Sequence, residues 1–200
     1  RQVRATRAEL AEALTGKILP RHRILLKVHL QQVDALKLGQ LTLEQELTQM
    51  LLPFRHQQEL LITIPGVGPL VAQAIIAEIG VDMSRFPTVG HLISWAGLCP
   101  KNDESAGKKR STRLRKGDPW LKTMLNQAAW AASRARGTYL QAQYQRLWRK
   151  RGQKKALMAV AASILTAAYH MLKNDVPYKE LGADYFQRRE PNKTLLRLVK

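Results

Sequence analysis

Ser105 stands in a strongly basic stretch of the chain, residues 101–116. A serine hydroxyl can act as a nucleophile on a phosphodiester when nearby cations neutralise the charge that develops on the phosphate. Seven lysine and arginine residues, opposed only by two acids, supply such cations: Lys101, Lys108, Lys109, Arg110, Arg113, Arg115 and Lys116. The stretch therefore predicts a nucleic-acid-binding surface, with phosphoryl transfer at Ser105 as the sharper hypothesis and a solvated basic loop as the plainer one.

Other catalytic arrangements do not occur in the sequence. The five histidines are scattered, and there is no H-E-x-x-H, C-x-x-C or G-K-[ST] pattern. The few carboxylates near the basic stretch make no convincing divalent-metal site; they are Glu78, Asp82, Asp103 and Glu104. The residues alone therefore provide Ser105 with no evident base or metal, and a loop serine without a catalytic role remains the commoner interpretation.

A glycine-containing turn, Ile64-Pro-Gly-Val-Gly-Pro69, precedes the basic stretch. Gly66 and Gly68 allow unusual backbone angles and leave no side chain between backbone N–H groups and an incoming phosphate. The dipole of a helix that starts near Pro69 would add positive potential there. The motif predicts a helix-hairpin-helix element that binds phosphates without reading bases, and a tight turn that binds nothing is the alternative.

The whole chain is strongly basic. Its 33 Lys and Arg residues against 15 Asp and Glu give a formal charge of +18 in 200 residues, which favours a polyanionic partner.

Apolar runs are broken well before the roughly 18 residues that a spanning helix needs, so we expect no membrane partner. The single Cys99 cannot form an internal disulfide, which fits a reducing cytoplasm. A start at Arg1 without a signal peptide suggests a piece of a longer cytoplasmic protein.

The sequence predicts an all-α fold with an arm over 1–59. Leucines and valines at helical spacing between Pro20 and Gly39 indicate one helix, and the Thr42/Gln45 capping box indicates a second. Two such helices would form an antiparallel hairpin or a coiled-coil arm, and an apolar stripe without an internal partner favours dimerisation. Packing of the stripe onto the rest of the chain is the alternative.

A compact helical domain is expected over 60–190, followed by a tail over 191–200. Asp118-Pro119 is a typical helix start, and the later glycines predict helices to about Arg136, over 139–150 and over 154–172. Alanines in the first and third of these predict close helix packing. Three tryptophans could stack on bases, although burial in the core is commoner at helical positions; they are Trp120, Trp130 and Trp148. Tyr185 and Phe186 could anchor the segment after Pro177 onto the domain.

A series of motifs in order resembles the C-terminal domain of the DEDD-type insertion-sequence transposases, the IS-one-ten and IS-eleven-eleven group of bridge-RNA-guided recombinases. They are I-P-G-V-G-P, A-E-I-G, S-R-F-P, H-L-I-S-W-A-G-L-C-P, N-D-E-S-A-G-K and L-G-A-D-Y-F. The resemblance covers roughly Leu60 to Phe186, and the arm before it matches the connecting coiled coil of that family.

The resemblance implies a DNA recombinase that cuts and rejoins strands through a phosphoserine intermediate. The family serine falls on Ser105, while a later S-K-x-G serine of many relatives is replaced here by Arg115-Lys116-Gly117, which leaves Ser111 as a nearby competitor. Lys108, Lys109 and Arg110 would then steady the phosphate. The family's Mg²⁺ is held by four acids of a RuvC-like domain outside this chain, so we expect no cofactor in the chain and no cleavage by it alone.

The resemblance also implies the partners: DNA, a structured guide (bridge) RNA, and further copies of the chain in a dimer or tetramer, in the bacterial cytoplasm near the nucleoid. Two other functions stay open. The chain could be a non-catalytic helix-hairpin-helix module for DNA or RNA, with Ser105 incidental. It could also be a dimerisation scaffold whose charge serves RNA packing.

Overall fold

A computed structural model describes residues 5–16, 18–101, 103–105, 108–111 and 113–189, and the predicted tail at 191–200 lies outside these residues. The side chains of Ser105, Lys108, Lys109 and Arg110 also lie outside the described part of the chain. The chain divides into two compact units, 1–52 and 53–200, with the boundary seven residues before the one expected at 60.

The first unit contains α1 (Arg7–Leu14) and α2 (Pro20–Leu51). Thr6 and Glu9 form a capping box that starts α1. The predicted break at Gly39 is wrong, because α2 is one 32-residue helix that continues through this glycine. A single glycine costs only about 1 kcal/mol inside a helix, and its neighbours are good helix formers. Thr42 does not cap a second helix; its hydroxyl donates to the Leu38 carbonyl at 3.1 Å.

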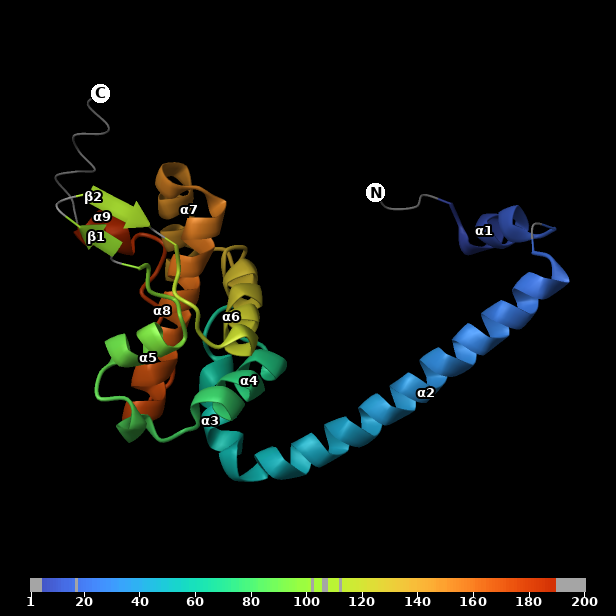
Figure 1. The fold of residues 1–200 in the computed structure, drawn as a ribbon, viewed down its shortest axis with the longest axis horizontal. Helices are drawn as coiled ribbons and strands as arrows, with labels where there is room; N and C mark the ends of the chain where they lie inside the picture. The colour runs from blue at the N-terminus through green and yellow to red at the C-terminus, as the bar shows by residue number, and fades with distance from the viewer. Residues whose placement is uncertain (1–4, 17, 102, 106–107, 112, 190–200) are drawn as a thin grey trace. The chain divides into compact units, whose positions relative to one another are not determined.

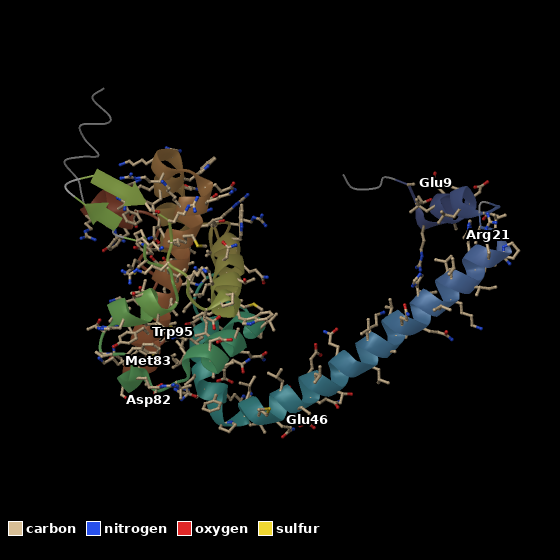
Figure 2. All side chains as sticks on the ribbon, viewed as in Figure 1. Glu9, Arg21, Glu46, Asp82, Met83 and Trp95 are labelled. Carbon is tan, nitrogen blue, oxygen red and sulfur yellow. The ribbon has the colours of Figure 1, made fainter. Side chains whose placement is uncertain are left out.

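The described side chains of α2 are exposed along almost its whole length, as Figure 2 shows around Glu46. From residue 33 to residue 50, apolar side chains follow the heptad spacing that a coiled-coil seam requires, with the polar Gln40 at one position of the seam; the apolar residues are Val33, Leu36, Leu43, Leu47 and Met50. Within the described part of the first unit, no partner covers this seam.

The second unit is helical, and the only strands among the described residues form one short hairpin. Its elements are η1 (Leu52–Phe54), which contains Pro53 and begins at the unit boundary, then α3 (Arg55–Ile62), α4 (Pro69–Ile79), η2 (Met83–Arg85), α5 (Val89–Trp95), β1 (Asp103–Ser105), β2 (Lys108–Ser111), α6 (Pro119–Ala132), α7 (Tyr139–Arg151), α8 (Gln153–Asn174) and α9 (Tyr185–Arg189). The all-α prediction is therefore confirmed.

Helix α8 forms the centre of this unit and contacts α3, α5, α6 and α7 (Figure 1). Alanines on α6 and α8 are fully buried, which lets the two backbones approach closely as predicted; they include Ala129, Ala132, Ala161 and Ala168. By length and composition α8 could also cross a membrane, although half of its most apolar stretch is buried within the unit. Its apolar character therefore matches that of a core helix.

The polypeptide after α8 returns to the helical core. Tyr185 and Phe186 on α9 lie 5.1 and 5.2 Å from the Tyr139 ring, measured between ring centroids. The Arg146 guanidinium lies 4.1 Å from the Phe186 centroid, a cation–π contact. The expectation that the two aromatics anchor the segment after Pro177 onto the domain is confirmed.

The expectation that the three tryptophans are buried in the core is wrong at two of the three positions. The Trp120 and Trp148 side chains are 72% and 52% exposed, and only Trp130 is half-buried, beneath the Arg134 guanidinium. Trp120 stands in the first turn of α6 and Trp148 in the last turn of α7, and neither belongs to the buried face of its helix.

The turn between α3 and α4 uses its two glycines differently. Gly66 has a φ of +89°, and a Cβ there would lie 2.4 Å from the Ala128 carbonyl and 2.5 Å from the Ala132 nitrogen of α6. Gly68 has an ordinary φ of −93°, is the N-cap of α4 and faces open space. Packing against α6 is thus a sufficient reason for glycine at 66, whereas only Gly68 leaves room for a ligand.

The same substitution at the two glycines is expected to separate these roles. Gly66→Ser combines positive φ with a clash against α6 and should lower the free energy of unfolding by about 2–4 kcal/mol. Gly68→Ser should change it by less than about 0.5 kcal/mol, because serine is a good N-cap and the space is open. Urea unfolding followed by circular dichroism measures both, and similar losses at the two sites would contradict this assignment.

Candidate nucleic-acid interface

The basic stretch forms a two-stranded antiparallel β-hairpin. Asp103 pairs with Ser111, Glu104 with Lys109, and Ser105 with Lys108, with a bulge between the first two pairs. The sequence indicated a loop here and missed the strands, because lysine, glutamate and aspartate have low strand propensity and no alternating apolar pattern marks them. The pairing places Ser105 at the tip end of β1, opposite a lysine.

The hairpin continues towards the helical core through regular backbone pairing. The Lys101 N–H donates to the Arg113 carbonyl at 2.8 Å, and the Arg115 N–H donates to the Cys99 carbonyl at 3.3 Å. Pro100 and Leu114 form an antiparallel bridge between these bonds. Three of the predicted cationic positions therefore belong to the paired base of the hairpin rather than to a free loop.

Two glycines bring the hairpin's ends together. A Cβ on Gly97 would lie 2.7 Å from the Gly117 nitrogen, and a Cβ on Gly117 would lie 2.4 Å from the Gly97 nitrogen. Real Cβ atoms do not approach backbone so closely, so only glycine fits at either position. Gly97 also has a φ of +66°. The crossing fixes where the basic hairpin leaves the helices α5 and α6.

Ser111, the alternative nucleophile, has a local structural role. Its Oγ accepts a hydrogen bond from the Arg113 N–H at 3.2 Å. It pairs with Asp103, the acidic residue at the start of β1, whereas Ser105 pairs with Lys108. The residue paired with Ser105 is therefore basic, and the residue paired with Ser111 is acidic.

The carboxyl groups of Glu78 and Asp118 lie together where the hairpin joins the helical core, and the sequence did not indicate this pair. Asp118 follows Gly117 directly, and its Oδ1 caps α6 by accepting from the Leu121 N–H at 2.8 Å. A hydrogen bond to Asp118 raises the pKa of Glu78 on α4, with burial and the like charge adding to the shift. Only folding brings these residues together, since forty positions separate them in sequence.

Lys122, which no sequence motif indicated, also contacts the end of the hairpin that joins the helical core. Its Nζ donates to the Arg115 carbonyl at 3.1 Å. This bond joins the first turns of α6 to the returning strand of the hairpin. A lysine one turn after a helix start is an ordinary surface pattern, so no local signal could have revealed the contact.

The remaining carboxylates do not assemble a metal site in the described part of the chain. Across those residues there is no cluster of three or more His, Cys, Asp or Glu side chains that could hold a metal ion. Asp82 instead caps η2, and its hydrogen bonds from the Ser84 hydroxyl and backbone N–H lower its pKa. Asp82, Met83 and Trp95 are labelled in Figure 2.

Comparison with known proteins shows similarity over the segment that contains this hairpin. Residues 58–145 match the model of the Transposase IS116/IS110/IS902 family. The chain is 30% identical over 126 residues to the "Pilin gene-inverting protein" of Moraxella bovis, covering 62% of this chain and 39% of that protein. It is 34% identical over 94 residues to the "Probable family 20 transposase" of Pseudomonas aeruginosa, covering 43% and 28%.

A third relative, the "Insertion element IS110 uncharacterized 43.6 kDa protein" of Streptomyces coelicolor, is 31% identical over 125 residues, covering 60% of this chain and 29% of that protein. The matched segment thus spans less than two fifths of the length of each of these relatives. The family match begins within α3 and ends within α7. It therefore includes the turn with Gly66 and Gly68, the contact between Gly97 and Gly117, and the hairpin with Ser105. The similarity to transposases is thus confined to this central part of the chain.

The carboxyl pair predicts a pH-dependent effect of Glu78→Gln. Because the pKa of Glu78 is raised by folding, the unfolded chain loses this proton first, and the stability of the wild type falls as the pH rises above the ordinary glutamate range. Glutamine keeps a donor for Asp118 and cannot ionise. Relative to wild type, the variant should therefore gain stability between about pH 4 and about pH 7.

Urea unfolding at the two pH values measures this difference. Glu46→Gln on α2 removes one carboxylate far along the sequence from the pair and is the matched control, for which no such gain is expected. An effect of Glu78→Gln that is equal at both pH values would show that the pair does not share a proton in the folded chain.

Proposed function

We propose that this chain is the serine-bearing part of a DNA transposase or site-specific recombinase of an insertion sequence. The observation that carries the proposal is the register of the basic hairpin, which sets Ser105 opposite Lys108 at the tip of a cationic β-ribbon. The similarity of residues 58–145 to transposases supports it. Ser105 is the proposed catalytic residue.

The chemistry proposed for Ser105 is a balanced transesterification. Its Oγ attacks the scissile phosphorus and loses its proton, an Oγ–P bond forms, and the bond from phosphorus to one deoxyribose oxygen breaks. The departing sugar oxygen takes up a proton. Attack by the hydroxyl of another strand reverses these steps, joins the strands and returns serine, so that no oxidant and no external energy source is needed.

The hairpin cations are proposed to bind the DNA backbone and stabilise the phosphorane charge. They stand on both strands and at the paired base: Lys101, Lys108, Lys109, Arg110, Arg113, Arg115 and Lys116. Cations held by a paired backbone are better placed than those of a free loop, because less conformational entropy is lost on binding. Gly68, open at the start of α4, offers a second phosphate contact of helix-hairpin-helix type.

A metal ion is proposed to act from outside this chain. The described residues offer no ligand set for Mg²⁺. The proposed arrangement has an acidic RuvC-like domain contribute the ion and a structured guide RNA select the DNA. The fragment alone is therefore expected to bind nucleic acid without cutting it.

Self-association is proposed through α2. Its seam of Val33, Leu36, Leu43, Leu47 and Met50 follows coiled-coil spacing and is exposed. Exposed apolar residues in such a continuous line mark an interaction surface more often than scattered ones do. A parallel or antiparallel pair of α2 helices would give the dimer that brings a metal domain to a serine domain.

The serine chemistry is tested by trapping the covalent intermediate. The chain joined to its acidic domain, with guide RNA, DNA and Mg²⁺, should form a protein–DNA adduct that survives denaturant, and the modified peptide should contain Ser105. Ser105→Ala should abolish the adduct, and Ser111→Ala is the matched control that should retain it.

Other results would favour other functions. Salt-sensitive DNA binding without any adduct would favour a non-catalytic helix-hairpin-helix module, in which Gly68 and Lys109 substitutions weaken binding and Ser105→Ala is silent. An adduct that persists in Ser105→Ala and disappears in Ser111→Ala would move the nucleophile to Ser111. Loss of function only from charges on α2 would favour a dimerisation scaffold.

The role of α2 is tested by its own matched pair of variants. Leu43→Glu/Leu47→Glu places two charges in the seam and should convert the oligomer to a monomer, because the charges would be buried on association. Leu38→Glu/Leu41→Glu adds the same charge at exposed positions outside the seam and should leave the oligomer intact. Sedimentation measures both, and dissociation by both variants alike would contradict a specific seam.

A further inference from the structure

A second cationic surface lies at the junction of α7 and α8, separate from the hairpin. Residues 119–174 contain ten Lys and Arg residues and no Asp or Glu. Nine of the ten are exposed, and five of these stand within seven positions: Arg149, Lys150, Arg151, Lys154 and Lys155. Gly152, with a φ of +80°, joins the two helices between them. A polyanion approaching this junction meets no carboxylate from α6, α7 or α8.

Helix stability explains only part of this cluster. Arg149, Lys150 and Arg151 occupy the last turn of α7, where cations interact favourably with the helix dipole. Lys154 and Lys155 occupy the first turn of α8, where the dipole disfavours them, and no side chain caps that helix or places an acid in its first turn. Helix stability therefore does not explain why lysines stand at positions 154 and 155. Their presence there suggests that this helix start binds an anionic partner.

An aromatic pair stands beside these cations. Tyr144 and Trp148 lie one turn apart on α7, with ring planes 7° apart and centroids at 6.3 Å. That distance is near the outer end of the range for contacting aromatic pairs, so the rings are nearly parallel without tight stacking. Since the Trp148 side chain is 52% exposed, part of its indole is accessible next to Arg149.

The neighbouring aromatic–cation contacts are already occupied within the fold. Arg146 lies over Phe186 and holds α9, and Arg134 lies over Trp130 on α6. Trp120, although more exposed than Trp148, stands at the start of α6 and not in the basic junction. Trp148 thus combines an accessible ring face with a cluster of exposed cations.

We propose that the α7–α8 junction binds an unpaired DNA strand, with a base stacked on Trp148 and the following phosphates on the junction cations. Duplex DNA offers phosphates but no free base faces, whereas single strands bind to aromatic platforms lined by Lys and Arg. The choice of DNA rests on the proposed function, because strand cutting and rejoining leave DNA transiently unpaired. The surface would hold the opened strand away from the hairpin.

The test uses the whole 200-residue chain carrying Ser105→Ala, so that the measured binding does not depend on the proposed nucleophile. The probe is a fluorescent oligothymidylate of about 15 nucleotides, near the upper site size of single-strand binders. Trp148→Ala should weaken its binding by about 5- to 150-fold, the loss expected for one stacked base. Trp148→Phe should retain most of the affinity, and Trp120→Ala, the matched exposed tryptophan, should retain all of it.

The charge contribution is read from the salt dependence of the same binding. Lys154→Gln/Lys155→Gln should reduce the slope of log K against log salt by about 1.4, two phosphate contacts on a single strand. Lys27→Gln/Lys37→Gln on α2 removes the same charge outside the junction and should leave the slope unchanged. Circular dichroism and urea unfolding confirm that each variant is folded.

Three results would overturn the proposal. Duplex DNA that binds as tightly as the oligothymidylate, with no effect of Trp148→Ala, would show a general phosphate surface. A matched oligouridylate that binds more tightly through Trp148 would replace the DNA strand by RNA. No binding by a folded chain would remove the site altogether. A failure of the Ser105 adduct leaves this binding test unaffected, so the two proposals fail independently.

Discussion

Two stretches of backbone cross at Gly97 and Gly117 too closely for any side chain to fit between them. This contact closes the ends of the basic hairpin and joins it to α5 on one side and to α6 on the other. Three further contacts lie close to this crossing. Asp118, the residue after Gly117, caps α6 and contacts Glu78, and Lys122 donates a hydrogen bond to the Arg115 carbonyl. The position of Ser105 relative to the helical core therefore depends on a steric constraint, not on the charges around it.

The helical core relies on the same kind of close approach. Gly66 lies against the backbone of α6, and buried alanines let α6 and α8 pack closely. Trp120 and Trp148 remain at the surface, within a segment, 119–174, that contains no acidic residue. The hairpin and the α7–α8 junction are the two cationic segments proposed to bind nucleic acid.

Local signals predicted several elements well. Asp118-Pro119 and the glycines near 137 and 152 identified α6, α7 and α8, because caps and helix ends depend on neighbouring residues. Three features were not predicted, each for a physical reason. The strands of the hairpin are stabilised by backbone pairing and not by strand propensity. Gly39 is tolerated inside α2, and the burial of a tryptophan depends on which residues the fold places against it.

By itself the sequence determined the all-α class, the strong positive charge, the basic stretch around Ser105 and the ends of the last long helices. These are properties of composition and of residues close together along the chain. Only the tertiary structure decided that Ser105 pairs with Lys108, that Gly66 serves packing while Gly68 stays open, and that Glu78 meets Asp118. Each of these is a contact whose partner is chosen by the three-dimensional path of the backbone, which no local pattern encodes.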